Sequence, residues 1–295
     1  MPAGTVLELI LKSTYNTNKW CDAMLIISNK EFNRLATYIK TNYGINLTEK
    51  KKALVEGRLR GILQQKNIRN FSDYYDYIVA DNTGEAVITL INKITTNHTF
   101  FMREPEHFRY FSDTVLPYWA GLLEGEKDIR VWSAGCSSGQ EPYTLAMIMS
   151  DFFGLNKRLW DTRILATDIS MQVVKKALDG IYPNEQIINL PNRWRRQYFK
   201  EYDEDNSMVM DNIKNDVIFR MFNLVNCKFP FKKKFHIIFC RNVMIYFDNK
   251  TKMELVNKFY DCTEPGGFLF IGHSESLNRQ ETKYKYVMPA VYRKE

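Results

Sequence analysis

The chain has 295 residues, of which 45% are hydrophobic and 14% aromatic. This length exceeds the ~100–200 residues typical of one domain, so we expect one large or two unequal domains with a sizeable core. The sequence has no apolar run of the ~18 residues needed to cross a bilayer, and its first residues do not resemble a signal peptide. We therefore expect a soluble, cytoplasmic protein that does not insert into a membrane.

Cysteine and histidine are sparse. The five cysteines form no CxxC pair, and the four histidines lack the spacing of metal ligands, which argues against a disulfide framework and a zinc site. We expect a reduced protein without a bound metal. The net charge of +7 favours an acidic partner, but a composition rich in lysine and asparagine gives the same charge without any function.

The N-terminal part of the chain is predicted to be helical. Residues 1–28 show no clear periodicity and are interpreted as an N-terminal extension. Ser28 and Glu31 have the spacing of a capping box, and the apolar residues that follow recur at helical intervals. This pattern predicts a helix over residues 29–43.

Three more helices are expected before the first strand. Thr48 is expected to cap the second helix, in which basic residues alternate with apolar ones. Ser72 is expected to cap a helix over residues 72–80, and residues 84–94 have the pattern of another. Residues 29–94 are therefore predicted to form a small helical domain.

The stretch 129–149 has the pattern of a strand, a loop of small residues and a helix. Gly135 and Gly139 permit a sharp turn and a close approach of the backbone to a ligand, and the helix that begins near Glu141 presents free amide hydrogens. The spacing differs from G-x-G-x-x-G, which disfavours NAD. The pattern predicts a site for a nucleotide-like ligand, although ordinary α/β domains also contain glycine-rich turns.

After this loop, strands and helices alternate, which predicts an α/β sheet. A polar segment between two of the strands predicts a small inserted hairpin. Strand ends and glycine turns gather polar residues at one edge of such a sheet, where its ligand binds. The expected strands are 163–168, 217–222, 235–240, 268–272 after a turn at Gly266-Gly267, and 286–292; the expected helices are 171–178, 192–200 and 251–262, and the polar segment is 201–215.

An acidic residue ends the second of these strands. Asp168 follows the glycine loop at a distance that suits hydrogen bonds donated to its carboxylate by both hydroxyls of a ribose. The alternative is an N-cap, because a helix begins just after Asp168. Together with the glycine loop, Asp168 favours the ribose role.

Seven segments carry a closer resemblance: TTNHTFFMREPEHF at 95–108, GQEPY at 139–143, ATDIS at 166–170, GIYP at 180–183, FNLVN at 222–226, CRNVMIYFD at 240–248 and FIGHSESL at 270–277. In this order they resemble the chemotaxis receptor glutamate O-methyltransferases, the CheR family. The similarity covers about residues 29–295. It implies an α/β fold, in which a Rossmann-like S-adenosylmethionine-dependent methyltransferase sheet with a reversed final strand follows a small all-α domain and carries an inserted β-subdomain.

The resemblance divides the chain into residues 29–94 and 95–295, with the inserted subdomain at about 187–216. It implies S-adenosyl-L-methionine as the cofactor, S-adenosyl-L-homocysteine as the product, and glutamates of methyl-accepting chemotaxis receptors as the substrate, esterified for sensory adaptation. We expect a monomer that reaches the membrane only through its receptors.

The resemblance also implies roles for individual residues. Arg103 and Tyr246 are expected to be catalytic. A basic surface on the helical domain is expected to dock receptors and is formed by Lys51, Arg58 and Arg60. The residues expected to bind the cofactor are Asn97, Thr99, Arg103, Glu141, Asp168, Asn223, Leu224, Arg241 and Asn242.

This chemistry fits a chain without a recognisable Ser/His/Asp or Cys/His set. A glutamate with a reference pKa of ~4.3 is already ionised at neutral pH, so the reaction needs no general base. Alignment of the two reactants can provide several of the ~7–11 kcal/mol attributed to proximity. Arg103 is expected to orient a carboxylate, and the Tyr246 hydroxyl is expected to lie beside the transferred methyl group.

Three alternatives remain open from the sequence: methylation of another protein, methylation of nucleic acid, and binding of S-adenosylmethionine without catalysis. Enzymes that methylate bases usually carry a D/N-P-P-aromatic loop after the fourth strand, whereas residues 241–244 are Arg-Asn-Val-Met. We therefore expect no nucleic-acid partner. The presence of both Arg103 and Tyr246 disfavours a module without catalysis.

Overall fold

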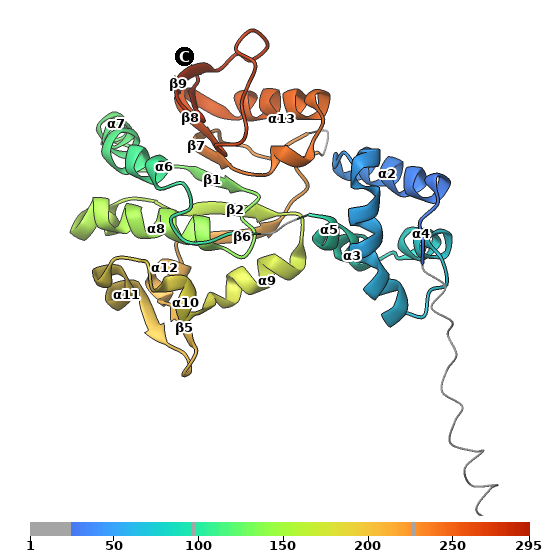
Figure 1. The fold of residues 1–295 in the computed structure, drawn as a ribbon. Coiled ribbons are helices and arrows are strands. Elements are labelled where there is room, and N and C mark those ends of the chain that lie inside the picture. The colour runs from blue at the N-terminus through green and yellow to red at the C-terminus, as the bar shows by residue number, and fades with distance from the viewer. Residues whose placement is uncertain (1–24, 96–97, 226–227) are drawn as a thin grey trace, which may run out of the picture.

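The computed structural model describes residues 25–95, 98–225 and 228–295. Figure 1 shows a small group of helices beside a larger α/β unit, with a third, smaller layer below the main sheet. Among the described residues, no helix combines the length and apolarity that crossing a membrane requires.

The helical group begins with the capping box that the sequence predicts. The Ser28 hydroxyl accepts a hydrogen bond from the Glu31 amide, and the Glu31 carboxylate accepts one from the Ser28 amide. Gly44 ends this helix with a left-handed φ of 71°. The helices are α2 (Asn29–Tyr43), η1 (Glu49–Lys51), α3 (Lys52–Gln65), α4 (Phe71–Ala80) and α5 (Glu85–Ile94).

Two predicted caps are wrong. Thr48 precedes η1 but makes no side-chain capping bond to the described residues. The side chain of Asn70, and not that of Ser72, caps α4 by accepting a bond from the Asp73 amide. Ser72 lies inside the first turn, where its amide and hydroxyl donate to Glu31 and so join α4 to α2.

The main sheet contains seven strands in the order β6-β2-β1-β7-β8-β10-β9. Its first five strands are parallel, and β10 runs antiparallel to both β8 and β9, so the predicted reversed end is confirmed. The strands are β1 (Val131–Ala134), β2 (Ile164–Asp168), β6 (Val217–Met221), β7 (Phe235–Cys240), β8 (Thr263–Ile271), β9 (Lys285–Met288) and β10 (Val291–Arg293).

Helices cover both faces of this sheet (Figure 1). Alternate residues of the central strands enter two separate cores: Val131 packs in one and Trp132 in the other. This alternation is what a strand buried on both faces requires. The covering segments are α6 (Pro105–Tyr110), η2 (Phe111–Val115, a π-helical turn), α7 (Leu116–Leu122), α8 (Gln140–Phe153), η3 (Gly154–Leu159), α9 (Met171–Asp179), η4 (Met244–Tyr246) and α13 (Asn249–Asp261).

Two strand predictions need correction. Gly266 and Gly267 lie within β8 rather than in a turn before it, and a Cβ at Gly267 would come within 2.9 Å of the His236 carbonyl oxygen on the neighbouring strand. The strand predicted over 286–292 is a hairpin of β9 and β10, because Pro289 and Ala290, the latter with a φ of 62°, turn the chain between them.

The inserted segment forms a second sheet of three antiparallel strands, in the order β3-β5-β4. This sheet confirms an inserted β-subdomain, but it begins at Ile181, before the predicted bounds of about 187–216. It lies below the main sheet in Figure 1. Its elements are β3 (Ile181–Pro183), α10 (Asn184–Ile187), α11 (Asn192–Tyr198), β4 (Phe199–Glu201), β5 (Asn206–Val209) and α12 (Asp211–Lys214).

Candidate functional site

A cavity of about 330 Å³ lies where the strands β1, β2, β6 and β7 end and the helical group meets the sheet. Its volume is at the lower end of the ~300–1,000 Å³ typical of small-molecule sites. On the side of the helical group, its wall includes Tyr43, Ile45, Ile91 and Asn92. The site is therefore shared by the two parts of the chain.

The glycine turn after β1 forms the floor of the cavity. Gly135 has a φ of 90°, and a Cβ there would come within 2.3 Å of the Val243 side chain. The amides of Gly135 and Cys136 both donate to the Thr167 carbonyl, which closes the turn against β2. The Ser137 hydroxyl lines the same cavity and is buried without a hydrogen-bond partner among the described residues.

Asp168 ends β2 beside this turn. One carboxylate oxygen accepts a bond from the Ser137 amide at 2.9 Å and the other from the Ser170 amide at 3.0 Å. The side chain that caps α9 is Ser170, which accepts from the Val173 amide, so the capping alternative for Asp168 is wrong. Burial raises the pKa of Asp168 despite these donors. The backbone thus fixes this carboxylate at the cavity wall.

Arg241 is the buried centre of the site, with only 2% of its side chain exposed. Its guanidinium donates to Glu104 at 3.0 Å, to Glu141 at 3.1 Å and to the backbone carbonyl of Arg103. Glu141 also accepts from the Ser133 hydroxyl. Burial raises the pKa of Glu141, and Arg241 opposes this shift. Arg241 and Glu141, both predicted to bind the cofactor, are therefore bonded to each other.

Arg103 occupies a strained turn. Met102 and Glu104 on either side of it have φ values of 59° and 57°. Residues other than glycine adopt such values only at a cost in free energy. The Arg103 guanidinium donates to the His98 carbonyl at 2.6 Å. Because Arg241 holds both the Arg103 carbonyl and the Glu104 carboxylate, the buried network fixes the turn that places Arg103 on the cavity.

Glu275 is a site component that the sequence interpretation missed. Its carboxylate is buried and accepts bonds from the amides of Gly272, Asn242 and Ile245 at 2.6, 3.0 and 3.1 Å. Burial raises its pKa, and these amide donors oppose the shift. Glu275 therefore fastens the loop after β7, which carries Asn242 and Tyr246. The sequence contains one signal for it, because Glu275 lies in FIGHSESL, one of the segments that carry the family resemblance.

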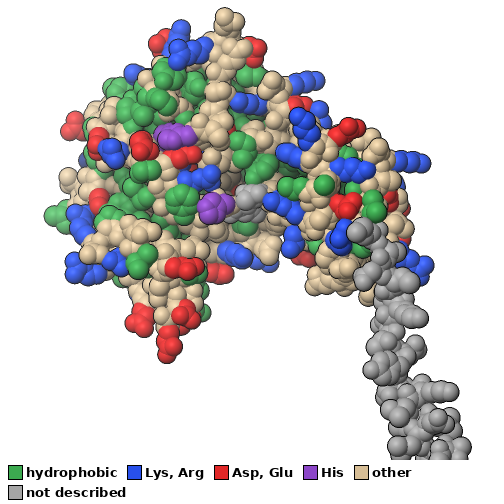
Figure 2. All heavy atoms as spheres, in the orientation of Figure 1, with side chains coloured by type: hydrophobic (Ala, Val, Ile, Leu, Met, Phe, Trp, Pro, Cys, Tyr) green, Lys and Arg blue, Asp and Glu red, His purple; other side chains and the backbone are tan. Residues whose placement is uncertain are grey.

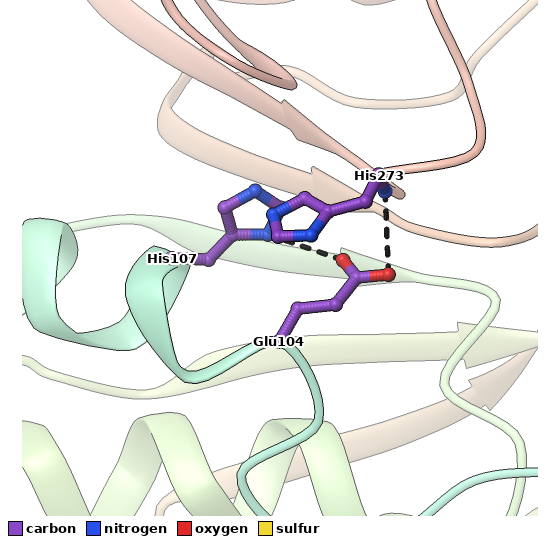
Figure 3. Close-up of side chains that lie close together, drawn as sticks. All are labelled: Glu104, His107 and His273. Carbon is purple, nitrogen blue, oxygen red and sulfur yellow. Dashed lines mark hydrogen bonds and ion pairs between the residues drawn. The ribbon is translucent and has the colours of Figure 1, made fainter.

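Glu104, His107 and His273 lie together beside this network (Figure 3). Their ligand-type atoms lie within 4.8 Å of one another, the spacing of a possible metal site. Glu104, however, already accepts bonds from Arg241, and that guanidinium disfavours a second cation. Burial lowers the pKa of His107 to about 4, so its ring is neutral at pH 7. We assign no metal here.

Contacts between the two parts of the chain close one side of the cavity. The Asn46 amide donates to the Tyr246 carbonyl at 2.7 Å, and Ile45 forms a β-bridge with Phe247. Asn223 donates through its side-chain amide to the Asn42 carbonyl at 2.9 Å. Asn223 thus lines the cavity and also ties the sheet to the helical group.

The predicted docking residues have different environments. Arg58 is half-buried and donates to the carbonyls of Lys93 and Ile94 at the C-terminal end of α5, each at 3.1 Å. Arg60 forms an ion pair with Glu56 on the same helix. Lys51 lies in η1 and is half-buried. The docking role remains a prediction, and Arg58 also stabilises the helical group.

The other predicted site residues come together. Asn97, which was also predicted to bind the cofactor, lies outside the described residues. Residues from five segments that are far apart in the sequence share one cavity wall. Those that line it are Thr99, Arg103, Glu141, Asp168, Asn223, Leu224, Arg241, Asn242 and Tyr246.

The cavity fits S-adenosylmethionine. It has the volume for a nucleoside, a glycine turn without room for a side chain, a carboxylate fixed at the end of β2, and the unsatisfied Ser137 hydroxyl. Together with the reversed strand β10, these features define a Rossmann-like, S-adenosylmethionine-dependent methyltransferase.

Comparisons with known proteins give the family. The SAM binding domain of CheR methyltransferases matches residues 97–292, and their all-alpha domain matches residues 30–95. The chain is 44% identical over 281 residues to the chemotaxis protein methyltransferase of Borreliella burgdorferi, across 95% of this chain and 99% of that protein. It is 34% identical over 271 residues to the Escherichia coli chemotaxis protein methyltransferase, across 91% and 92%. The chain belongs to the CheR family of chemotaxis methyltransferases.

Proposed function

We propose that this enzyme is a protein-glutamate O-methyltransferase that esterifies glutamate side chains of bacterial chemoreceptors. The observation that carries the proposal is the position of Arg103, which a strained turn and the buried Arg241 hold on the wall of the cofactor cavity. A fixed guanidinium suits recognition of a carboxylate. The names of the relatives, chemotaxis protein methyltransferases, support chemoreceptors as the substrate.

Bound S-adenosylmethionine supplies a methyl group on a positively charged sulfur. A glutamate of the receptor, already ionised at neutral pH, is the nucleophile, and Arg103 orients it. Since opposite charges disappear as the reaction proceeds, a site from which water is excluded favours the transition state. Tyr246 contributes its hydroxyl at the same wall, and Glu275 and Arg241 keep the two loops that carry Tyr246 and Arg103 in place.

In the proposed cofactor site, Asp168 accepts hydrogen bonds from the ribose hydroxyls, and Ser137 offers its unsatisfied hydroxyl nearby. Thr99, Asn223, Leu224 and Asn242 complete the wall, whereas Glu141 and Arg241 act mainly by fixing each other. Asn97 stays a predicted contact.

We also propose the organisation of the protein and its partners. Residues 29–94 form the docking domain and residues 95–295 the catalytic domain, with an extension before them. The enzyme acts in the cytoplasm as a monomer on methyl-accepting chemotaxis receptors, and nucleic acid is not a substrate.

The test is incubation with methyl-labelled S-adenosylmethionine and a chemoreceptor signalling domain. We expect label on glutamate that mild base releases, and no label on a receptor whose methylated glutamates are replaced by alanine. A parallel reaction contains nucleic acid in place of the receptor domain. Label that resists base, or that appears on nucleic acid instead, would overturn the proposal.

A second test separates catalysis from binding. Arg103→Ala and Tyr246→Phe should lower the rate of methyl transfer more than they weaken cofactor affinity, because both residues are proposed to act on alignment. Binding of S-adenosylhomocysteine, measured by calorimetry, provides the comparison. Equal losses in rate and affinity would reduce both residues to cofactor ligands.

A further inference from the structure

The C-terminal end of α2 and the turn after it, residues 40–46, form a corner of the helical group that lies against the loop after β7. The Asn46 amide donates to the Tyr246 carbonyl at 2.7 Å, and Ile45 pairs with Phe247 in an antiparallel bridge. The side chains of Tyr246 and Phe247 also pack against the core of the helical group. The α2 corner therefore contacts the segment that carries the proposed catalytic tyrosine through both backbone and side chains.

An ion pair holds the next residue of this loop. The Lys40 ammonium lies 2.7 Å from the Asp248 carboxylate, which also caps α13 by accepting a bond from the Thr251 amide. The bond from Lys40, helped by the Thr251 amide, lowers the pKa of Asp248 to about 2, so this carboxylate is ionised at neutral pH. Lys40 thus connects α2 to the start of α13, directly after Tyr246 and Phe247.

Gly44 lets the α2 corner approach the sheet this closely. Its φ of 71° is left-handed, and a Cβ there would lie 2.7 Å from the Val225 side chain and 2.9 Å from the Thr251 side chain. Both are β-branched side chains with little freedom to move aside. Gly84, before α5, has a similar φ of 76°, but a Cβ there would meet no atom of the described residues within 4 Å. Gly44 is therefore required by its contacts as well as by its backbone conformation.

The loop that carries Tyr246 is held from two sides. Glu275 of the sheet accepts a bond from the Ile245 amide, and the α2 corner donates one to the Tyr246 carbonyl. The helical turn η4 has only three residues, and so short a helix has little stability of its own. A displacement of about 1 Å can cost up to ~10²-fold in rate, so both supports affect how well the Tyr246 hydroxyl is aligned.

We propose that the α2 corner positions Tyr246 for methyl transfer, and that Gly44 and Lys40 are positioning residues of the reaction. The helical group then acts in catalysis as well as in the docking of receptors. This inference rests on the proposed function, because it requires that Tyr246 takes part in methyl transfer. Its consequence is that a change in the α2 corner slows turnover even when receptor and cofactor are saturating.

The first test compares Gly44→Ala with Gly84→Ala. Both variants carry the strain of a left-handed alanine, but only Gly44→Ala pushes the α2 corner away from the loop. With saturating cofactor and receptor, Gly44→Ala should lower the rate of methyl transfer about tenfold, and Gly84→Ala should stay within about twofold of wild type. Affinity for S-adenosylhomocysteine, measured by calorimetry, should change less than about threefold in both. A folded Gly44→Ala protein with the wild-type rate, or with equal losses of rate and affinity, would overturn the proposal.

Lys40 keeps the proposal testable if Gly44→Ala does not fold. The Lys40–Asp248 pair is partly exposed, so Lys40→Met should leave the protein folded and lower the rate by up to about fivefold, whereas Lys40→Arg should retain it. Asp248→Asn keeps a good N-cap for α13, and in that background Lys40→Met should have little further effect. A wild-type rate for Lys40→Met would overturn its positioning role.

The Tyr246→Phe background gives the decisive result. If the α2 corner acts through the Tyr246 hydroxyl, Gly44→Ala should slow Tyr246→Phe by less than about threefold, although it slows the wild type about tenfold. Equal factors in the two backgrounds would mean that the α2 corner acts elsewhere and would overturn the proposal. A wild-type rate for Tyr246→Phe would overturn the role of Tyr246 and this inference together, whereas a wild type that labels no glutamate would overturn the proposed function.

Discussion

The helical group and the strand ends of the main sheet use charged residues in opposite ways. In the helical group, Arg34 and Asp76 form an ion pair whose side chains are 47% and 63% exposed. At the strand ends, Arg241 pairs with Glu104 and Glu141 with only 2% of its side chain exposed. Exposed pairs add ~0–1 kcal/mol to stability, whereas breaking a buried pair costs ~3–5 kcal/mol. The buried charges therefore fix the geometry of the cavity wall, whereas the exposed pair adds little to stability.

The largest expected effect follows from removing the buried guanidinium. Arg241→Met leaves Glu104 and Glu141 buried without their cation and should lower the free energy of unfolding by about 3–5 kcal/mol. Arg34→Ala in the helical group should lower it by less than about 1 kcal/mol. Urea unfolding of both variants checks the contrast. Similar losses in the two variants would mean that the two regions do not differ in the way their charges act.

A buried histidine should make the stability of the main sheet sensitive to mild acid. His236 accepts a bond from the Arg130 amide, and burial, with help from Arg130, lowers its pKa to about 4. In the unfolded chain its pKa is near 6.5, so its contribution is complete above pH 6.5 and is lost as pH falls toward 4. The loss amounts to about 3 kcal/mol by pH 4.

The measurement is the unfolding free energy of wild type and His236→Gln between pH 7.5 and 4. As pH falls, the unfolding free energy of the wild type should decrease relative to that of the variant, because the glutamine does not titrate. Glu141 and Glu275, whose pKa values burial raises, titrate in both proteins and cancel in this difference. A difference that does not change with pH would contradict the prediction.

An effect of intermediate size is expected at the cofactor site. Asp168→Ala removes the proposed ribose partner and should weaken binding of S-adenosylmethionine by about 1.5–3 kcal/mol, the scale of a hydrogen bond to a charged group. Ser170→Ala is the matched control, because it removes the side-chain cap of α9 two residues away and should affect stability rather than binding. Wild-type affinity in a folded Asp168→Ala protein, measured by calorimetry, would exclude the ribose role.

Local patterns predicted the parts of the fold that local physics determines. The capping box at Ser28 and the alternation of strands and helices agree with these patterns, whereas the reversed end of the sheet was implied by the family resemblance. The hairpin of β9 and β10 was missed, although Pro289 marks its turn. A proline inside a strand pattern argues against an unbroken strand, so this signal was present in the sequence. The resemblance to a family identified residues that the structure gathers in one cavity.

Long-range hydrogen bonds could not be predicted in this way. Glu275 and the loop after β7 are about thirty residues apart in the chain. Nothing in this spacing indicates that the Glu275 carboxylate accepts hydrogen bonds from the amides of Asn242 and Ile245 in that loop. Likewise, the spacing of Arg241, Glu104 and Glu141 does not indicate that the Arg241 guanidinium donates to both carboxylates. Such residues became recognisable only when the sheet brought the loops together.

The smallest expected effect concerns receptor docking by the helical group. Lys51 lies in η1, and a glutamate-bearing receptor presents the opposite charge. Attraction between such surfaces speeds encounter and weakens as salt shortens the Debye length, which is about 10 Å at 0.1 M. Lys51→Glu should therefore raise the receptor concentration for half-maximal methylation by a few-fold at low salt, which corresponds to less than about 1 kcal/mol.

Arg58 requires a different interpretation, because the same substitution there also removes hydrogen bonds to the carbonyls at the end of α5. Arg58→Glu places a negative charge beside the negative end of a helix dipole, so we expect it to destabilise the helical group by about 1 kcal/mol as well as to weaken docking. Thermal unfolding separates these causes: Lys51→Glu should keep the wild-type melting temperature, and Arg58→Glu should not. If Lys51→Glu methylates receptor fragments like wild type at low salt while Arg58→Glu does not, the defect of Arg58→Glu arises from the fold. Docking would then depend on the inserted sheet or on the edge of the main sheet.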